Sequence, residues 1–424
     1  MEQAMGPGTE PTATRLWNRD FTLVVIGQVV SIFGNMVLSF ALPLYILDIS
    51  GSASMFGLVL GLPYIALLVT SPIGGIMADR LRKQRIMFWL DLVTTVIVVL
   101  FLAAFLSVRD MVASAVPIVI VKLMALNAIQ GVYMPAVQAS VPVLVPRDKL
   151  VPANSAVSAV NMIANMAAPA AAGMLFGRFG LFPILAISAV CFAVTAVMDL
   201  FIRIPFKRQG ATGGIIKMVR SDIAHSMRFI VRAKPVLAKS AVIMFMASLA
   251  LALLFVGVPV LITRHLGMEM AWVGINQSVI MLGGLLGGII AGLLGTRMTM
   301  RKLHLPLALC GLVLVPMALV LMFDMPTFAA YVVITAASAL LLLALQICAI
   351  QLMAFIQGET PVELVGKVMS IMLVLPFLAN AIGMVFFGVL FEWFAEMPWA
   401  VVFAVVLASA LMALYARGSF RKID

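Results

Sequence analysis

The chain has 424 residues, of which 64% are hydrophobic and only 11% are charged. Soluble domains carry roughly 45–50% apolar and 25% charged residues, and a single aqueous core stops growing well before this length, so a soluble globular fold is excluded. The net charge of +11 is spread over short loops, which argues against a nucleic-acid partner and for contact with anionic lipid headgroups.

Apolar runs of about 20 residues, the length of a membrane-spanning helix, recur along the whole chain. None shows the ten-residue alternation of a membrane β-barrel, so we predict an all-α integral membrane protein. In chain order the twelve predicted spans are 21–46, 54–77, 86–107, 112–134, 153–177, 180–202, 237–262, 272–296, 304–323, 327–356, 365–391 and 398–416.

The basic residues predict how these spans are oriented. Of the 28 Lys and Arg residues, 24 fall in alternate gaps between the spans. Basic residues concentrate in cytoplasmic loops, so both termini are expected in the cytoplasm, which requires an even number of helices. The first 14 residues lack the apolar run of a signal peptide. We expect a multi-pass protein of the bacterial cytoplasmic (inner) membrane.

The longest polar stretch lies near the middle of the chain and separates six spans from six. Apolar residues recur within it at helical spacing, which is consistent either with a basic amphipathic helix on the membrane surface or with a solvated linker helix. The expected regions are a disordered cytoplasmic tail (1–14), a six-helix bundle (15–203), a cytoplasmic linker (204–236), a second six-helix bundle (237–417) and a cytoplasmic tail (418–424).

The two halves also resemble each other in sequence. The stretch that begins at Gly75 matches the one that begins at Gly292, at an offset of 217 residues, and Val145-Pro146 matches Thr360-Pro361 at an offset of 215. Each of the two glycines is expected to let a pair of helices approach closely. Parallel repeats of six helices are the plan of a transporter that works by alternating access.

The stretch Gly75-Ile-Met-Ala-Asp79-Arg80-Leu-Arg82-Lys83-Gln-Arg85 resembles the loop between helices two and three of the major facilitator superfamily, Gly-x-x-Ala-Asp-Arg-x-Gly-Arg-Lys. Arg82 stands where the family usually has Gly, and that departure is shared by macrolide-efflux-like drug and siderophore exporters. Similarity to this branch extends along nearly the whole chain, for example at Pro135-Ala136, Ala153-Asn154-Ser155 and Ala168-Pro169-Ala170. The resemblance implies two pseudo-symmetric six-helix bundles, the major facilitator fold.

The resemblance also implies a cytoplasmic gate at this loop. Asp79 would meet the N-terminus of span eleven, and nearby basic side chains would pair with it or with lipid phosphates. The alternative is a plain cytoplasmic loop with the basic residues that such loops usually carry. The gate residues expected are Gly75, Asp79, Arg80, Arg85 and Arg297.

Three ionisable residues lie inside predicted spans, where each costs roughly 2.5–3.5 kcal/mol at the bilayer centre. Lys122 lies near the middle of span four and is expected to contact an anionic substrate, to pair with an acid or to change protonation. Asp91 and Asp199 lie about one turn from the cytoplasmic ends of spans three and six, from where they can extend to the interface. These three are the candidates for proton coupling.

Uncharged polar residues share a face of span one and a face of span four at helical spacing. Such faces usually join helices, but in the superfamily helices one, four, seven and ten line the central cavity. Asn127-x-x-Gln130-Gly131 also resembles the Arg-x-x-Gln-Gly motif of proton-coupled exporters, with Asn127 in place of arginine. The expected substrate-binding residues are Gln28, Ser31, Asn35, Lys122, Asn127 and Gln130.

The sequence has no phosphate-binding loop of the Gly-x-x-x-x-Gly-Lys-Ser/Thr type, and its three His and three Cys form no cluster, so we expect no enzyme, metal or cofactor. We predict a secondary active exporter of amphipathic small molecules: a drug, a macrolide-like compound or a siderophore. The resemblance implies proton antiport. A lysophospholipid translocator of the same fold, a channel and an inward symporter are the alternatives. The expected partners are substrate, protons and membrane lipids, and the protein is expected to be a monomer.

Overall fold

The structure is a computed structural model that describes residues 16–107, 112–204, 234–295, 298–323 and 325–421. Within these ranges, twelve helical segments are long and apolar enough to cross a membrane. They coincide with the twelve predicted spans, so the prediction of an all-α membrane fold is confirmed. The expected tail 1–14 and residues 205–233 of the expected linker lie outside the described part.

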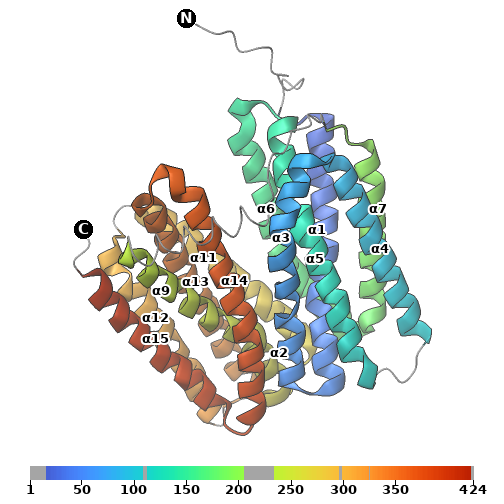
Figure 1. Cartoon of the computed structure of the whole chain (residues 1–424). Helices are drawn as coiled ribbons and strands as arrows, with labels where there is room; N and C mark the ends of the chain where they lie inside the picture. The colour runs from blue at the N-terminus through green and yellow to red at the C-terminus, as the bar shows by residue number, and fades with distance from the viewer. Residues whose placement is uncertain (1–15, 108–111, 205–233, 296–297, 324, 422–424) are drawn as a thin grey trace, which may run out of the picture. The chain divides into compact units, whose positions relative to one another are not determined.

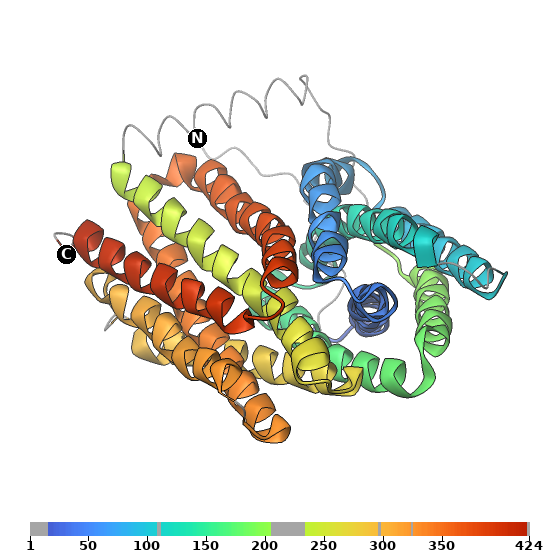
Figure 2. The ribbon, with the colours of Figure 1, turned by 90° about the horizontal axis from the view of Figure 1, so that it is seen from below.

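The chain divides into two compact units, of which the first comprises residues 1–42 and 66–210. Its long helices lie alongside one another in Figure 1, and Figure 2 views α1 along its axis. The helices of this unit are α1 (Arg19–Ser50, whose last turns belong to the second unit), α3 (Pro63–Arg80), α4 (Lys83–Ser107), α5 (Val112–Leu144), α6 (Leu150–Phe179) and α7 (Leu181–Phe201).

The second unit comprises residues 43–65 and 211–424. Residues 43–65, which the sequence places in the first bundle, pack with this unit because glycines bring α2 and α14 together. A Cβ atom at Gly57 would meet the carbonyl oxygen of Met384, and one at Gly61 would meet that of Ala381. The helices of this unit are α2 (Ala53–Gly61), α9 (Pro235–Ala252), α10 (Val258–Val260), α11 (Met270–Leu294), α12 (His304–Met322), α13 (Thr327–Glu359), α14 (Val362–Trp393) and α15 (Pro398–Phe420).

The seventh span, which begins with α9, changes its helical pitch twice. Two π-helical turns, Leu253–Gly257 and Leu261–His265, flank α10. Pro259 lies between them and lacks the amide hydrogen that would bond back to the preceding turn, which is consistent with the wider turns around it. This span therefore differs from the continuous α-helix that its apolar run predicts.

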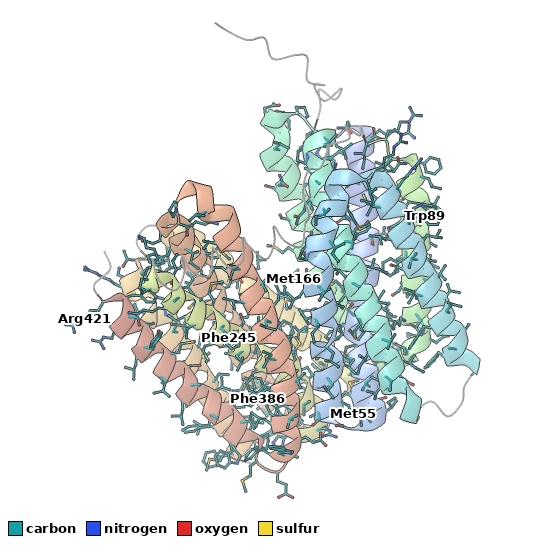
Figure 3. All side chains as sticks on the ribbon, in the orientation of Figure 1. Met55, Trp89, Met166, Phe245, Phe386 and Arg421 are labelled. Carbon is teal, nitrogen blue, oxygen red and sulfur yellow. The ribbon has the colours of Figure 1, made fainter. Side chains whose placement is uncertain are left out.

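Large apolar side chains remain exposed along the helices of both units. Leu293 is 80% exposed, and Trp89 and Phe386 are exposed as well. Figure 3 shows the side chains along the helices, with Trp89 and Phe386 labelled. Water would penalise so much apolar surface, whereas lipid tails do not. A helix that is apolar on every side is therefore stable here, and the sequence shows no single hydrophobic stripe.

Glycines produce an equivalent close helix contact in each unit. A Cβ atom at Gly74 would collide with the carbonyl oxygen of Gly131, so α3 and α5 touch backbone to backbone. In the second unit a Cβ atom at Gly283 would collide with the carbonyl oxygen of Ala339, between α11 and α13. The contacting positions are 57 residues apart in the first unit (131 minus 74) and 56 in the second (339 minus 283). Gly283 lies 209 residues after Gly74 (283 minus 74), not 217, so the two close contacts do not fall at the positions that the sequence match pairs.

Two details of the sequence prediction are wrong. A Cβ atom at Gly75 or at Gly292 would meet no described atom within 4 Å, so the close approach expected at these residues is made by Gly74 and Gly283 instead. Residues 418–420, expected in the C-terminal tail, continue α15. Phe420 anchors this last turn because it is fully buried, with its ring centroid 6.1 Å from that of Phe355.

Candidate functional site

Polar side chains gather in the interior of the first unit, next to an apolar core that includes Phe21, Met87 and Val137. Burying a polar group without a partner costs free energy, so each of these positions needs an explanation. The buried polar residues include Gln28, Ser31 and Asn35 on α1, Asp91 and Thr94 on α4, Lys122 on α5, and Ser188, Thr195 and Asp199 on α7.

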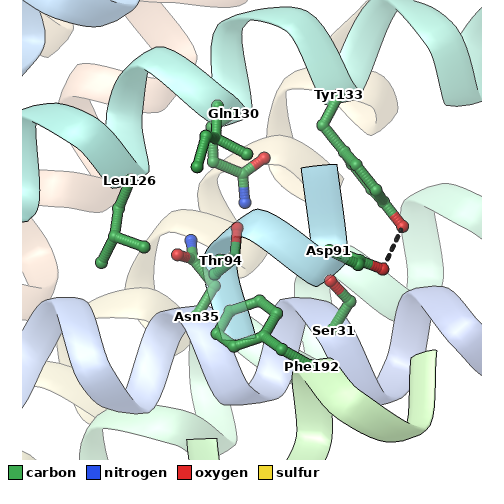
Figure 4. Close-up of a pocket in the computed structure, with 9 residues that line it drawn as sticks. Ser31, Asn35, Asp91, Thr94, Leu126, Gln130, Tyr133 and Phe192 are labelled. Atoms are coloured by element: carbon green, nitrogen blue, oxygen red, sulfur yellow. Dashed lines mark hydrogen bonds between the residues drawn. The ribbon is translucent and has the colours of Figure 1, made fainter. Parts of the chain in front are cut away.

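Tyr133 connects three of these helices through its hydroxyl group. Nε2 of Gln28 donates a 3.3 Å hydrogen bond to the Tyr133 oxygen, and Tyr133 donates a 3.5 Å hydrogen bond to Oδ2 of Asp91 (Figure 4). The hydroxyl groups of Ser31 and Thr195 also lie within hydrogen-bonding reach of this carboxylate. Asp91 is only 2% exposed, so it is held by neutral donors in an apolar interior and does not extend to the interface.

A small, partly open space is lined in part by Asp91. Its volume of about 10 Å³ is that of one water-sized group. Leu126, Ile129 and Phe192 form its apolar walls, and its polar lining consists of Ser31, Asn35, Asp91, Thr94, Gln130 and Tyr133. The space is therefore suited to a single small polar species and is far too small for a drug-sized molecule.

Asp199 lies close enough to Asp91 for the two carboxylates to interact electrostatically. It is also 2% exposed, and its Oδ2 has no hydrogen-bond partner among the described residues. Gln84 fixes the end of α7 by donating a 3.0 Å hydrogen bond to the backbone oxygen of Asp199. In the described part of the chain, no basic side chain lies within 4.0 Å of either carboxylate. Two buried acids without a cation are well placed to exchange protons.

Lys122 is a buried cation without an acid partner. It is 4% exposed, its Nζ has no hydrogen-bond partner, and no carboxylate of the described residues lies within 4.0 Å. Nζ lies 3.8 Å from the centroid of the Phe101 ring, a cation–π arrangement. Phe101 is ten residues beyond Asp91 on α4, about 15 Å along the helix. Of the three expected roles, pairing with an acid is therefore contradicted.

The structure brings together some of the predicted site residues and separates others. Gln28, Ser31, Asn35 and Gln130 lie with Asp91 around the Tyr133 hydrogen bonds or the small space. Asn127 does not join them, because its amide donates to the backbone oxygen of Leu123 one turn earlier on the same helix.

The expected gate residues are not assembled by contacts in the described part. Arg85 is exposed near the start of α4. Arg297 and the side chains of Asp79 and Arg80 lie outside what the structure describes. The gate therefore stays a prediction.

Tyr133, Thr94 and Phe101 are site residues that the sequence analysis missed. Helical spacing carried a signal for two of them, since Tyr133 follows Gln130 by three residues and Thr94 follows Asp91 by three. Aromatic and hydroxyl side chains are common in membrane spans, so the residue type alone does not indicate a functional site. Phe101 carried no such signal, because only the packing of α4 against α5 places it beneath Lys122.

The sequence analysis also missed a carboxylate of the second unit, Glu392, near the end of α14. Its Oε2 accepts a 2.6 Å hydrogen bond from the backbone amide of Ala53, the first residue of α2, and lies 3.5 Å from Nη1 of Arg264. A carboxylate satisfies unpaired amides at a helix N-terminus and interacts favourably with the helix dipole. Glu392 thus fixes the start of α2 to α14.

Solved structures with the same fold are membrane transporters. A bacterial homologue of the iron transporter ferroportin, in an inward-facing state, superimposes with a TM-score of 0.73 at 16% identity, over 94% of this chain and 98% of the other. A bacterial homologue of the human lysosomal transporter Spinster gives a TM-score of 0.72 at 13% identity, over 96% and 97%. At these identities the likeness shows the fold.

Macrolide efflux protein A of Streptococcus pyogenes is 26% identical over 193 residues, which are 45% of this chain and 46% of that protein. The protein of the same name from a serotype M6 strain matches equally. The match thus spans about half the length of these relatives, and it supports the macrolide-efflux-like branch. Residues 24–384 match the Major Facilitator Superfamily as a whole. The chain is therefore a multi-pass membrane transporter that belongs to the major facilitator superfamily.

Proposed function

We propose that this transporter is a secondary active exporter of amphipathic small molecules, drugs or macrolide-like compounds or siderophores, driven by proton antiport. It would contribute to multidrug resistance in the bacterial cytoplasmic membrane, with both termini in the cytoplasm, and work as a monomer. The observation that carries the proposal is the buried Asp91 carboxylate, with Asp199 near it and no basic partner among the residues that the structure describes, inside a transporter fold. The partial match to macrolide efflux protein A supports the direction of transport and the substrate class.

Proton coupling follows from the cost of burying charge. An ionised carboxylate in an apolar interior needs compensation, which here consists of the hydrogen bond from Tyr133 and the nearby hydroxyl group of Ser31. Binding a proton removes the charge and with it the need for these donors. A helix rearrangement that changes the donors around Asp91 would therefore change its affinity for a proton, which is the coupling that antiport requires.

The driving force is sufficient for drug export. One proton entering down a membrane potential releases about 2.3 kcal/mol per 100 mV. At about 1.4 kcal/mol per factor of ten, electrogenic one-for-one exchange sustains a roughly fortyfold substrate gradient.

Substrate contacts are proposed for the polar faces of α1 and α5. Lys122 has no acid of its own, so its ammonium group would meet an anionic or electron-rich group of the substrate, and Phe101 beside it would contact an apolar part. Gln28, Ser31, Asn35, Asn127 and Gln130 would supply uncharged hydrogen-bonding groups.

A cytoplasmic gate is proposed for the loop after α3. Asp79, at the end of α3, and the basic residues Arg80, Arg85 and Arg297 would hold the cytoplasmic side closed. The gate would open when these charge pairs break.

Uptake into inside-out membrane vesicles tests the proposal. Vesicles that contain the protein are energised, and accumulation of a radiolabelled macrolide and of a labelled lysophospholipid is measured against vesicles without the protein. Uphill accumulation of the macrolide, abolished by a protonophore, is expected. Movement of the lysophospholipid with none of the macrolide would instead identify a lipid translocator and contradict the proposal.

A further inference from the structure

We propose that the small space beside Asp91 is a binding site for a monovalent metal cation of the size of Na⁺, which competes with the proton for the same carboxylate. This inference rests on the coupling role proposed for Asp91. It concerns which ion occupies the site, and so it can fail without affecting export itself.

The lining supplies oxygen atoms from three helices. They are the carboxylate of Asp91, the hydroxyl groups of Ser31, Thr94 and Tyr133, and the side-chain amides of Asn35 and Gln130. Carboxylate, hydroxyl and amide oxygens are the ligands preferred by hard cations such as those of the alkali and alkaline-earth metals.

Several of these oxygens have lone pairs available. The Thr94 hydroxyl donates its proton to the backbone oxygen of Leu90 at 2.8 Å, which leaves its oxygen free to accept. Tyr133 likewise donates to Asp91. Oε1 of Gln130 is buried and has no hydrogen-bond partner among the described residues.

The charge of the lining matches a singly charged ion. Asp91 is the one carboxylate on the wall, and α1 contributes only uncharged groups. Asp199 on α7 interacts with Asp91 from outside the lining, while Lys122 lies over Phe101, about 15 Å farther along α4. Sites for divalent ions generally combine several acidic or imidazole ligands, and the described residues contain no group of three such side chains.

The size of the space also restricts its ligand to one small ion. About 10 Å³ admits one water-sized species, hence a dehydrated small cation but no organic one. The apolar side chains of Leu126, Ile129 and Phe192 shield it, which strengthens the attraction between a cation and the carboxylate. A bound Na⁺ neutralises Asp91 as a proton does, so the two ions are alternatives at one site.

Thermal unfolding of the purified full-length protein tests the site without transport. The unfolding midpoint is measured at pH 8 with increasing NaCl, while choline chloride keeps the ionic strength constant. A ligand that binds the folded state raises the midpoint in a saturable way. We expect such a rise with NaCl.

Variants show whether the rise of the unfolding midpoint with NaCl comes from this site. Asp91→Asn is expected to abolish it, and Gln130→Leu to raise the NaCl concentration for half-maximal effect about tenfold, the loss of one ligand. Gln138→Leu, an exposed position on the same helix, is the matched control and should respond as wild type. If Asp91→Asn does not fold, the comparison of Gln130→Leu with Gln138→Leu still shows whether Na⁺ binds in this space.

A response to NaCl no larger than to choline chloride, or one unchanged in Gln130→Leu and Asp91→Asn, would overturn the inference. Proton-driven macrolide export by a protein that does not respond to Na⁺ would then leave the proposed function intact. A Na⁺ response at Asp91 in a protein that exports no drug would have the opposite meaning: the cation site would stand, and the proposed function would fail.

Discussion

The hydroxyl group of Tyr133 lies between Gln28 and Asp91, accepting a 3.3 Å hydrogen bond from one and donating a 3.5 Å hydrogen bond to the other. One side chain of α5 thus links α1 to α4 at the buried carboxylate. A rotation of α5 relative to its neighbours would alter the donors that Asp91 receives.

Replacing Tyr133 with Phe keeps the ring and removes the donor. The 3.5 Å bond is long, so its loss is expected to cost about 1 kcal/mol, equivalent to roughly fivefold slower proton-driven export. Export is measured as initial macrolide uptake into energised inside-out vesicles. Tyr415→Phe, at an exposed position on α15, is the control. Equal rates for the two variants would show that Tyr133 has no part in coupling.

Lys122→Met is expected to reduce transport without reducing the stability of the protein. Met retains the length of the side chain and removes a buried, unpaired cation, so the thermal unfolding midpoint should stay the same or rise. Export of substrates that carry an anionic group should fall about tenfold or more, the worth of one charged hydrogen bond. Lys149→Met, an exposed residue of the loop before α6, is the control. Transport at the wild-type rate in Lys122→Met would remove this residue from the substrate site.

Gly74→Ala is expected to destabilise the protein, whereas Gly75→Ala is not. The added methyl group at Gly74 collides with the backbone of Gly131, and overpacking of this kind costs about 1–3 kcal/mol. At Gly75 the methyl group meets no described atom within 4 Å. The midpoint of thermal unfolding in detergent measures both. A larger loss at Gly75 would contradict the packing described for α3 and α5.

Glu392→Gln is expected to loosen the start of α2. The substitution removes the charge that attracts the α2 amides and Arg264, and since Glu392 is partly exposed we expect a loss of only about 1 kcal/mol. The thermal unfolding midpoint should fall at low salt, with a smaller difference at 1 M salt because the ion pair is screened. Glu396→Gln, exposed a few residues farther on, is the control and should show neither change.

The helices were predictable from the sequence because lipid imposes a simple rule. A span must form all its backbone hydrogen bonds within itself and present apolar side chains to the lipid. Length and composition alone therefore locate Arg19–Ser50 as well as Pro398–Phe420. The helix ends were less predictable. Gly418 and Ser419 lie between basic residues and suggest a tail, yet the burial of Phe420 extends α15 through them.

The site was predictable only in part. Asp91, Asp199 and Lys122 were identifiable because a charge in a membrane span is costly. Their environments were not, since the distance from Lys122 to Phe101 and the Tyr133 bond depend on how helices distant in sequence pack. The same holds for the glycines: the internal repeat and the family resemblance identified Gly75, but only the contact between α3 and α5 shows that its neighbour Gly74 carries the close approach.

The most direct test of ion-coupled export follows proton movement and substrate movement together in proteoliposomes. A pH-sensitive dye inside the vesicles reports proton flux while a macrolide gradient is applied, for wild type and for Asp91→Asn. Macrolide-dependent proton flux in the opposite direction is expected for wild type, with none for Asp91→Asn, which should still allow downhill macrolide exchange. Equal macrolide-dependent proton flux in both proteins would contradict the role of Asp91, and its absence from wild type would contradict proton antiport.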